Sequence, residues 1–258
     1  MPTVTLLEKV YGPYSPETFQ PTLSSLCKGL KVRLRVVGGT SRGWIQIEVS
    51  GEDETVALHY LSQKVGFAPT FIDRLTRFST LRGRVISSGK GTSEVYVDVG
   101  VFSPKIRDAA VHLHSLRAQL ADGKMVPLER IIELFCLYEN LPLEVKILSH
   151  AGTEEKHAIA ELSEAQLART AQWIRSGLDR LIVLGVPISE VERAIRRSKH
   201  SRDIIRVEAL GLLENAIVCK LGTDAVGLIP KLGPLLSTAT LAPFCPRKIL
   251  GLIERPFL

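Results

Sequence analysis

The stretch LRGRVISSGKGTSEVYVDVG, residues 81–100, reads as two strands joined by a glycine-rich turn. In its second half Val95, Val97 and Val99 alternate with polar or aromatic residues, which is the pattern of a strand that buries one face. A third strand follows in AAVHLHSL (109–116), then apolar residues at helical spacing within 127–138, and a closing strand in PLEVKIL (142–148). Several strands with one inserted helix predict a small barrel over residues 80–150.

A second strand-rich stretch repeats this order. RGRVISSG (82–89) corresponds to IIRVEALG (204–211), EVYVDVG (94–100) to AIVCKLG (216–222), and AAVHLHSL to AVGLIPKL (225–232). Each series gives a strand, a turn containing glycine, a strand ending in glycine, and a third strand. We therefore expect a repeated β-module, in which residues 203–258 form a second, degenerate barrel and 226–229 is one of its strands.

The order of these motifs resembles the oligonucleotide-binding (OB) barrel of the ribosomal S-one type. Members of that family carry a strand ending in glycine and then a Gly-Phe-Val-His or Gly-Leu-Ile-Pro strand; here Gly227 to Pro230 and the pair Val111–His112 stand in the matching places. In overall texture the chain is also similar to an archaeal protein family of unknown function.

The resemblance implies that RNA crosses the second and third strands, where aromatic rings stack on bases and basic groups hold phosphates. The residues that it places there are Arg84, Tyr96, His112, His114 and Arg117. The alternative is that the tyrosine and the histidines are ordinary surface residues. The second copy has no aromatic residue at 216–219 and carries a proline in place of the histidine, which favours burial or a protein interface there.

The flanking regions complete the predicted architecture. Residues 1–79 show a strand at 4–10, a helix at 16–26, a hairpin at 30–49 and a helix at 53–65, a βαββα domain. Residues 151–202 read as a helical segment: Ser163 and Gln166 form a capping box before an apolar stripe that reaches Leu181, and Ser189 with Glu192 begins a shorter helix. The predicted fold class is α+β and multidomain, with a central OB-fold-like β-barrel, a helical pair and a C-terminal degenerate OB-like β unit.

The chain is basic, with a formal net charge of +6 and an isoelectric point near 9.2. The densest basic cluster lies in ERAIRRSKHSR (192–202), where helical spacing places Arg193, Arg196 and Arg197 on one face. Lys199 and Arg202 extend this cluster, and such a row can follow a phosphate backbone. Acidic residues begin this helix and basic residues end it, so an ordinary solvated helix that satisfies its macrodipole is the alternative.

Several classes of site find no support in the sequence. The four cysteines are isolated and fit small core residues of a reducing compartment; no metal site is predicted from them. SSGKGTS (87–93) lacks the first glycine and the Ser or Thr of a phosphate loop, and no catalytic motif is found. Asp98 and Asp108 could bind a metal ion in a nuclease-like site, but lone carboxylates beside a loop are usually solvated. We find no secretory signal or membrane span and expect a cytoplasmic protein.

These observations favour a non-catalytic RNA-binding protein that uses no cofactor and no small-molecule ligand. Its partner would be ribosomal, transfer or another structured RNA, in translation or RNA processing. The alternative is a protein-interaction adaptor that docks on a ribonucleoprotein or transcription complex through its apolar C-terminal unit. A metal-dependent nuclease is the third hypothesis.

Overall fold

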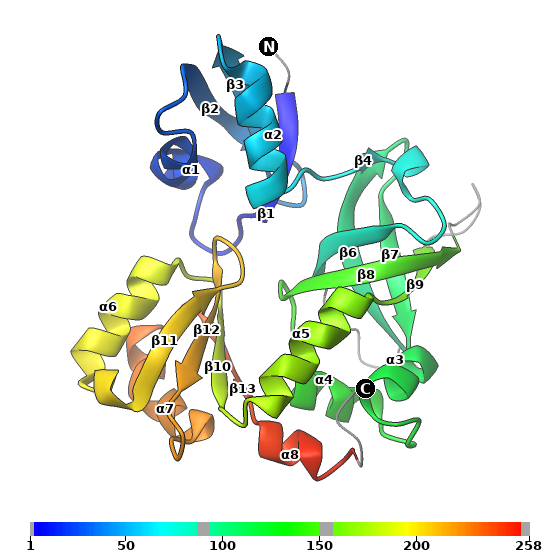
Figure 1. The fold of residues 1–258 in the computed structure, drawn as a ribbon, viewed down its shortest axis with the longest axis vertical. Helices are drawn as coiled ribbons and strands as arrows, with labels where there is room; N and C mark the ends of the chain where they lie inside the picture. The colour runs from blue at the N-terminus through cyan, green and yellow to red at the C-terminus, as the bar shows by residue number, and fades with distance from the viewer. Residues whose placement is uncertain (1–2, 87–92, 150–156, 254–258) are drawn as a thin grey trace.

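The computed structural model describes residues 3–86, 93–149 and 157–253, arranged as three units that pack against one another (Figure 1). The N-terminal unit has the predicted order. Its elements are β1 (Thr3–Lys9), a short 3-10 helix (Pro16–Phe19), α1 (Gln20–Leu26), β2 (Val32–Gly39), β3 (Trp44–Gly51) and α2 (Glu54–Lys64). The strands form an antiparallel sheet in the order β1-β3-β2, so the βαββα prediction is confirmed.

The alternation of β2 and β3 decides which face of this sheet is buried. Leu34 and Val36 of β2 and Ile47 of β3 lie in the core, while Arg33 and Arg35 on the opposite face are exposed. The two helices contribute Leu23 and Leu61 to the same core. Each buried aliphatic side chain contributes roughly 1.5–3 kcal/mol, so this one-sided burial fixes the register of the hairpin.

The central unit is a closed barrel. Its elements are β4 (Thr70–Phe71), a 3-10 helix (Ile72–Arg74), β5 (Thr80–Val85), β6 (Glu94–Ser103), β7 (Arg107–His112), α3 (Leu113–Leu120), α4 (Leu128–Phe135), β8 (Pro142–Ser149) and β9 (His157–Leu162). The strands follow the order β4-β6-β5-β8-β9-β7, and an additional β6–β7 pairing closes β5 to β9 into a five-stranded barrel. Strands β7 and β9 pair in parallel, and the other described pairs within the barrel are antiparallel. This is the strand order of an OB barrel, as predicted for the first copy.

The interior of the barrel follows from the valine alternation in the sequence. Val95, Val97 and Val99 of β6 are completely buried, and Val111 of β7 joins them. Strand β5 lies very close to β6 at Gly83, where a Cβ atom would collide with the backbone oxygen of Asp98. Only glycine therefore allows β5 and β6 to approach this closely.

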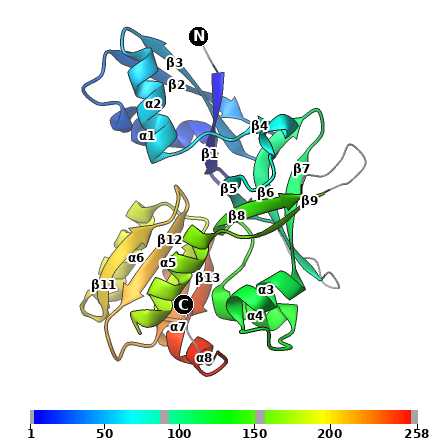
Figure 2. The same cartoon turned by 45° about the vertical axis from the view of Figure 1, so that its right-hand side comes forward.

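The C-terminal unit is built on a different plan. Its elements are α5 (Glu164–Arg175), β10 (Arg180–Leu184), α6 (Ile188–Ser198), a 3-10 helix (Ser201–Asp203), β11 (Ile204–Ala209), β12 (Glu214–Cys219), α7 (Ala225–Leu232), a 3-10 helix (Gly233–Leu235), β13 (Thr240–Phe244) and α8 (Pro246–Leu250). The sheet is antiparallel with the order β11-β12-β10-β13. Helices α6 and α7 lie on one side of it, and α5 lies on the other side, toward the barrel (Figures 1 and 2).

The predicted second barrel is therefore wrong. The stretch AVGLIPKL, expected to contain its third strand, forms helix α7, and the pairing partners of β12 are β10 and β11. Ala225, Leu228 and Leu232 are the buried residues of α7, at spacings of three and four, and Asp224 caps the helix by accepting a hydrogen bond from the Val226 amide. A short apolar run fits a buried strand or a buried helix equally well, which explains the error.

The segment 151–202 also differs from the prediction, because it supplies strands β9 and β10 as well as helices. Helix α5 begins at the predicted cap, where the Ser163 hydroxyl accepts a hydrogen bond from the Gln166 amide. It ends at Arg175, and Gly177 follows with a φ of +64°, the left-handed conformation that terminates helices. Leu181 consequently lies in β10. Helix α6 begins at Ile188, and Pro187 occupies its N-cap position in place of the predicted serine.

The apolar residues of β12 lie inside the molecule. All six residues of the strand are buried, and Ala216 packs toward the barrel side while Ile217 packs toward α6 and α7. They do not form the exposed docking face that the adaptor hypothesis placed in this unit.

All four cysteines are also buried, as predicted. Among the described residues, the helices are too short or too polar to cross a membrane.

Candidate nucleic-acid interface

Tyr96 lies on the outer face of β6, because the valines on either side of it point into the barrel. Its ring faces the ring of His157 at the start of β9, with the ring centroids 4.6 Å apart. His157 was not among the site residues predicted from the sequence. A signal was available, since Ala158, Ala160 and Leu162 alternate with more exposed residues and mark a strand that buries one face.

A second pair of rings lies beside the first. His112, at the end of β7, and His114, in the first turn of α3, stack with their centroids 5.6 Å apart and their planes inclined by 23°. Both histidines lie in the stretch 109–116, which was predicted to form one strand. The chain instead turns into α3 after His112, and the two rings still contact each other. The residue across from His112 in the ladder is Glu94.

Glu94 connects the two pairs of rings. Its carboxylate lies 2.7 Å from Nδ1 of His112. It also accepts a hydrogen bond from the Tyr96 hydroxyl, and that bond is the main reason why the pKa of Tyr96 is raised. One carboxylate therefore orients two rings on the outer surface of β6 and β7. We call Tyr96, His112, His114 and His157 the ring cluster.

The rest of the β6–β7 face is covered by the N-terminal unit. Asp98 is completely buried and accepts hydrogen bonds from Lys9 Nζ at 3.1 Å and from the Trp44 indole Nε1 at 3.0 Å. Arg42 forms an ion pair with both oxygens of Asp108 and also lies near Asp98. The two aspartates considered for a nuclease-like site are thus neutralised by cations from the neighbouring unit.

Arg84 was predicted to contact nucleic acid, and this prediction is wrong. Its side chain is only 2% exposed, and its guanidinium lies 2.7 Å from Glu8 of β1 and 3.4 Å from Glu214 of β12. Burial lowers the pKa of Arg84, but the carboxylates of Glu214 and Glu8 outweigh it and the pKa is raised. We call this cluster, with Tyr11, the three-unit junction, because it joins all three units.

Glu214 is the member of the junction whose ionisation is most relevant near neutral pH. Burial is the main reason why its pKa rises to about 7, although Arg84 acts in the opposite direction and Glu8 adds to the rise. The Tyr11 hydroxyl donates a hydrogen bond of 2.8 Å to its other oxygen. Two carboxylates thus share one arginine in the interior, so one negative charge there is poorly compensated.

Arg117 is engaged within its own unit. Its Nε donates a hydrogen bond of 2.8 Å to the backbone oxygen of Val126, and its Nη1 lies 3.6 Å from the sulfur of Met125. These contacts hold the connection between α3 and α4. They explain the position of Arg117 without a nucleic-acid ligand.

The basic helix α6 has the predicted faces. Val191, Ala194 and Ile195 are buried, and the side chains of Arg193, Arg196 and Arg197 are exposed. Arg196 lies 3.8 Å from Glu192 one turn earlier. Lys199 ends the helix with a φ of +62°, and Lys199 and Arg202 are exposed. The C-terminal sheet and α5 separate α6 from the barrel (Figures 1 and 2), so the ring cluster and the basic helix are two separate surfaces.

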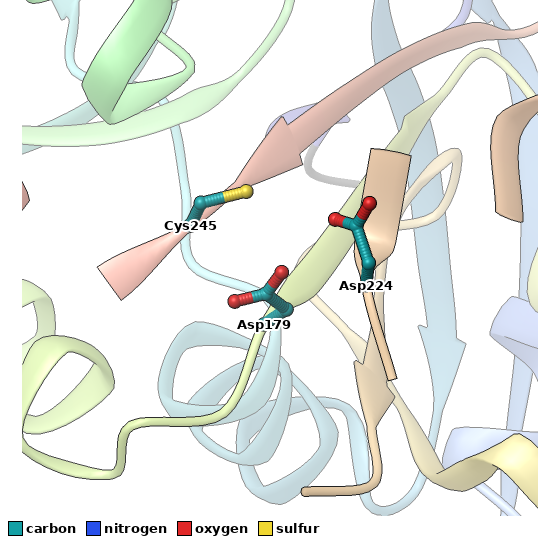
Figure 3. A group of neighbouring side chains, drawn as sticks. All are labelled: Asp179, Asp224 and Cys245. Atoms are coloured by element: carbon teal, nitrogen blue, oxygen red, sulfur yellow. The ribbon is translucent and has the colours of Figure 1, made fainter. Parts of the chain in front are cut away.

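Asp179, Asp224 and Cys245 come together from three segments, which the sequence analysis did not anticipate (Figure 3). Each offers one ligand atom, and these atoms lie within 4.8 Å of one another. The carboxylates accept hydrogen bonds from the amides of Ala225 and Val226 and so cap the first turn of α7. Burial and Asp179 raise the pKa of the Cys245 thiol to about 11, so the thiol stays protonated at neutral pH. These contacts are those of a helix cap.

The strand order and pairing define an OB-type barrel held between two α+β units, and the ring cluster lies on the outer face of that barrel. The chain belongs to the DUF2110 family: the models described as the DUF2110 N-terminal, central and C-terminal domains match residues 3–69, 77–174 and 178–242. The third match begins two residues before β10, in agreement with the observed C-terminal sheet.

The other comparisons add little. A search of curated proteins gives no match to the chain. Among solved structures, that of a protein from vaccinia virus (Wisconsin strain) is similar to 34% of this chain and to 88% of its own chain, with 14% sequence identity and a TM-score of 0.22.

Proposed function

We propose that the protein binds RNA without catalysing a reaction, and that bases stack on the ring cluster. The observation that carries this proposal is the position of four rings on the outer side of the barrel, from β6, β7, β9 and the first turn of α3. In an OB barrel this is the side on which oligonucleotides lie. Every base has an aromatic face, so stacking tolerates many sequences and is worth roughly 1–3 kcal/mol per base.

The covered half of the face limits what can bind. Arg42, Lys9 and Trp44 occupy the part near Asp98 and Asp108, which leaves the two ring pairs on the uncovered part. A short single-stranded stretch, or the loop of a structured RNA, fits such a surface better than a long strand does. A role with ribosomal, transfer or another structured RNA in translation or RNA processing agrees with this and with the resemblance to S-one barrels.

The test is the affinity of the full chain for a fluorescently labelled single-stranded RNA, measured by anisotropy. We expect Tyr96→Ala and His157→Ala each to weaken binding by roughly 1–3 kcal/mol, because each removes one stacking surface. Tyr60→Ala is the matched control, since Tyr60 is exposed on α2 in another unit. Equal affinity of the Tyr96 and Tyr60 variants would exclude the ring cluster as the binding surface.

Two further outcomes separate the alternatives. If the intact chain does not bind RNA but is recovered with a protein complex, the adaptor hypothesis is favoured. Cleavage of the labelled RNA that depends on added divalent cations would show that the protein is a nuclease.

A further inference from the structure

A cavity of about 320 Å³ lies between the barrel and the C-terminal sheet, on a different part of the barrel from the ring cluster. Four arginines from four elements line it. They are Arg82 of β5, Arg169 of α5, Arg180 of β10 and Arg206 of β11, and we call them the arginine cleft. An adjoining cavity of about 230 Å³ also contains Arg82 and Arg169.

The fold itself directs these side chains to one place. Arg180 and Arg206 both pair with Val218, one from each side, so they point to the same face of the C-terminal sheet. Helix α5 covers that face, and its residues Arg169 and Trp173 lie one turn apart. The exposed Arg82 reaches the cavity from the barrel side.

The positive charge of the cleft is poorly compensated. Arg180 is 3% exposed, yet its Nη1 donates to neutral oxygens, those of Ser176 and Leu178 at 3.0 Å and of Trp173 at 3.4 Å. Its buried Nε has no hydrogen-bond partner among the described residues.

Arg169 likewise donates to the neutral oxygens of Gln166 and Pro142. Its pKa is lowered by burial first and then by Arg82, with Glu144 acting in the opposite direction. Burial is also the main reason why the pKa of Arg180 is lowered. These arginines repel one another in a partly desolvated site.

Among the described residues that line the cavity, Glu208 supplies the one carboxylate, and it is bound to Arg206 with a distance of 2.9 Å from Nε. Several convergent guanidinium groups with too few carboxylates suit a phosphate group. A phosphate offers oxygens for paired hydrogen bonds to each guanidinium and supplies the missing negative charge. The Trp173 ring, which Arg180 covers at 4.9 Å, gives the cavity an aromatic wall.

We propose that the arginine cleft binds a phosphate group, either of an RNA backbone or of a free nucleotide. The proposal is independent of the ring cluster, because it rests on another surface of the barrel and on a different interaction. A phosphate can bind here whether or not bases stack on Tyr96.

The experiment is isothermal titration of the full chain with inorganic pyrophosphate and with ATP, and a parallel anisotropy titration with labelled RNA, all at low salt. We expect Arg169→Gln to weaken phosphate binding by about tenfold or more, since it removes charge-assisted hydrogen bonds. Arg175→Gln is the matched control, because it makes the same charge change on the exposed surface of the same helix. It should alter affinity by less than about threefold.

Glu208→Gln provides a control of opposite sign. Removing this carboxylate from the wall of the cavity should tighten phosphate binding by a few-fold, whereas Arg206→Gln should weaken it. Arg206 is exposed on an edge strand, so its variant tests the cleft even if Arg169→Gln disturbs folding. Circular dichroism of each variant checks the fold.

The two sources of phosphate give different results. Binding of pyrophosphate or ATP that Arg169→Gln weakens indicates a free nucleotide. Weakened RNA binding without measurable binding of the small phosphates indicates the RNA backbone. If none of the three ligands distinguishes the Arg169 and Arg206 variants from the Arg175 control, the proposal is wrong. Loss of RNA affinity in Tyr96→Ala would not rescue it, because that variant tests the ring cluster alone.

Discussion

The three-unit junction and the arginine cleft both bury arginine where units meet, but they differ in their counter-charges. Arg84 in the junction faces the carboxylates of Glu8 and Glu214, and its pKa is raised. Arg180 in the cleft faces neutral oxygens, and its pKa is lowered. The first arginine completes an internal ionic cluster. The second retains a charge for which the described residues supply little compensation.

This difference teaches that burial alone does not assign a role to an arginine. A buried ion pair is strongly destabilised when one member is removed, because the other member remains as an uncompensated charge. An arginine surrounded by neutral acceptors and other arginines lacks that coupling and is better satisfied by a bound anion. Two predictions test the buried charges of the junction, and a third tests exposed arginines that have neither environment, in order of decreasing effect.

The largest effect is expected for Arg84→Met. It leaves the carboxylates of Glu8 and Glu214 without their shared cation, so the free energy of unfolding should fall by about 3–5 kcal/mol. Arg82→Met, two residues earlier on the same strand but exposed, should change it by less than about 0.5 kcal/mol. Urea denaturation of both variants gives the measurement. A similar loss in both would show that the junction is no more important to stability than an exposed position.

The second effect is a pH dependence of stability. The folded pKa of Glu214 is near 7 and above its ordinary value of 4.5, so the folded chain binds the proton more tightly than the unfolded chain does. Stability contributed by this proton is present at low pH and is lost as the pH rises from about 4.5 through 7, by an amount on the order of 1–3 kcal/mol.

Glu214→Gln should remove this contribution and flatten the profile of stability between about pH 5 and about pH 8, measured by thermal or urea unfolding. Glu192→Gln, an exposed change on α6, should leave the slope as it is in the unmodified chain. A Glu214→Gln profile as steep as that of the unmodified chain would place the titrating group elsewhere.

The smallest effect on stability is expected at the surface arginines of α6. Replacing Arg193, Arg196 and Arg197 together by Gln should cost at most a few tenths of a kcal/mol per site, because Arg and Gln have similar helix propensities and Val191 and Ile195 stay buried. If this row holds RNA phosphates, the slope of log affinity against log salt should become shallower by roughly 2. An unchanged slope with an intact fold would leave α6 as an ordinary solvated helix.

The sequence predicted the parts of the fold that local periodicity determines. The valines of β6 and the hairpin of β2 and β3 alternate every second residue, and both elements form as expected. The barrel order then followed from the resemblance. Helix α7 was predicted as a strand for two reasons. Its apolar run is too short to distinguish the helical period of 3.6 residues from the strand period of two, and its residues aligned with a strand of the first barrel.

The candidate sites depended on contacts between distant residues, which periodicity does not contain. Arg84 lies 76 residues from Glu8 along the chain, so the sequence pattern could not indicate their ion pair. Arg84 was therefore predicted to be exposed and to contact RNA. The arginine cleft joins β5, α5, β10 and β11, and it required the C-terminal sheet to be known. Tyr96 was placed on the outer face because the alternation of a single strand is enough for that.

The packing between the units has a consequence for how the molecule comes apart. Phe244 and Ile182 of the C-terminal sheet belong to the same apolar core as the barrel valines, and Leu213 belongs to the core of the N-terminal unit. Removing any one of the three family segments would expose apolar surface on the other two. It would also remove one member of the ion pairs among Glu8, Arg84 and Glu214. We therefore expect each family segment to be less stable alone than within the whole chain, because it loses the apolar contacts that it makes with the other units.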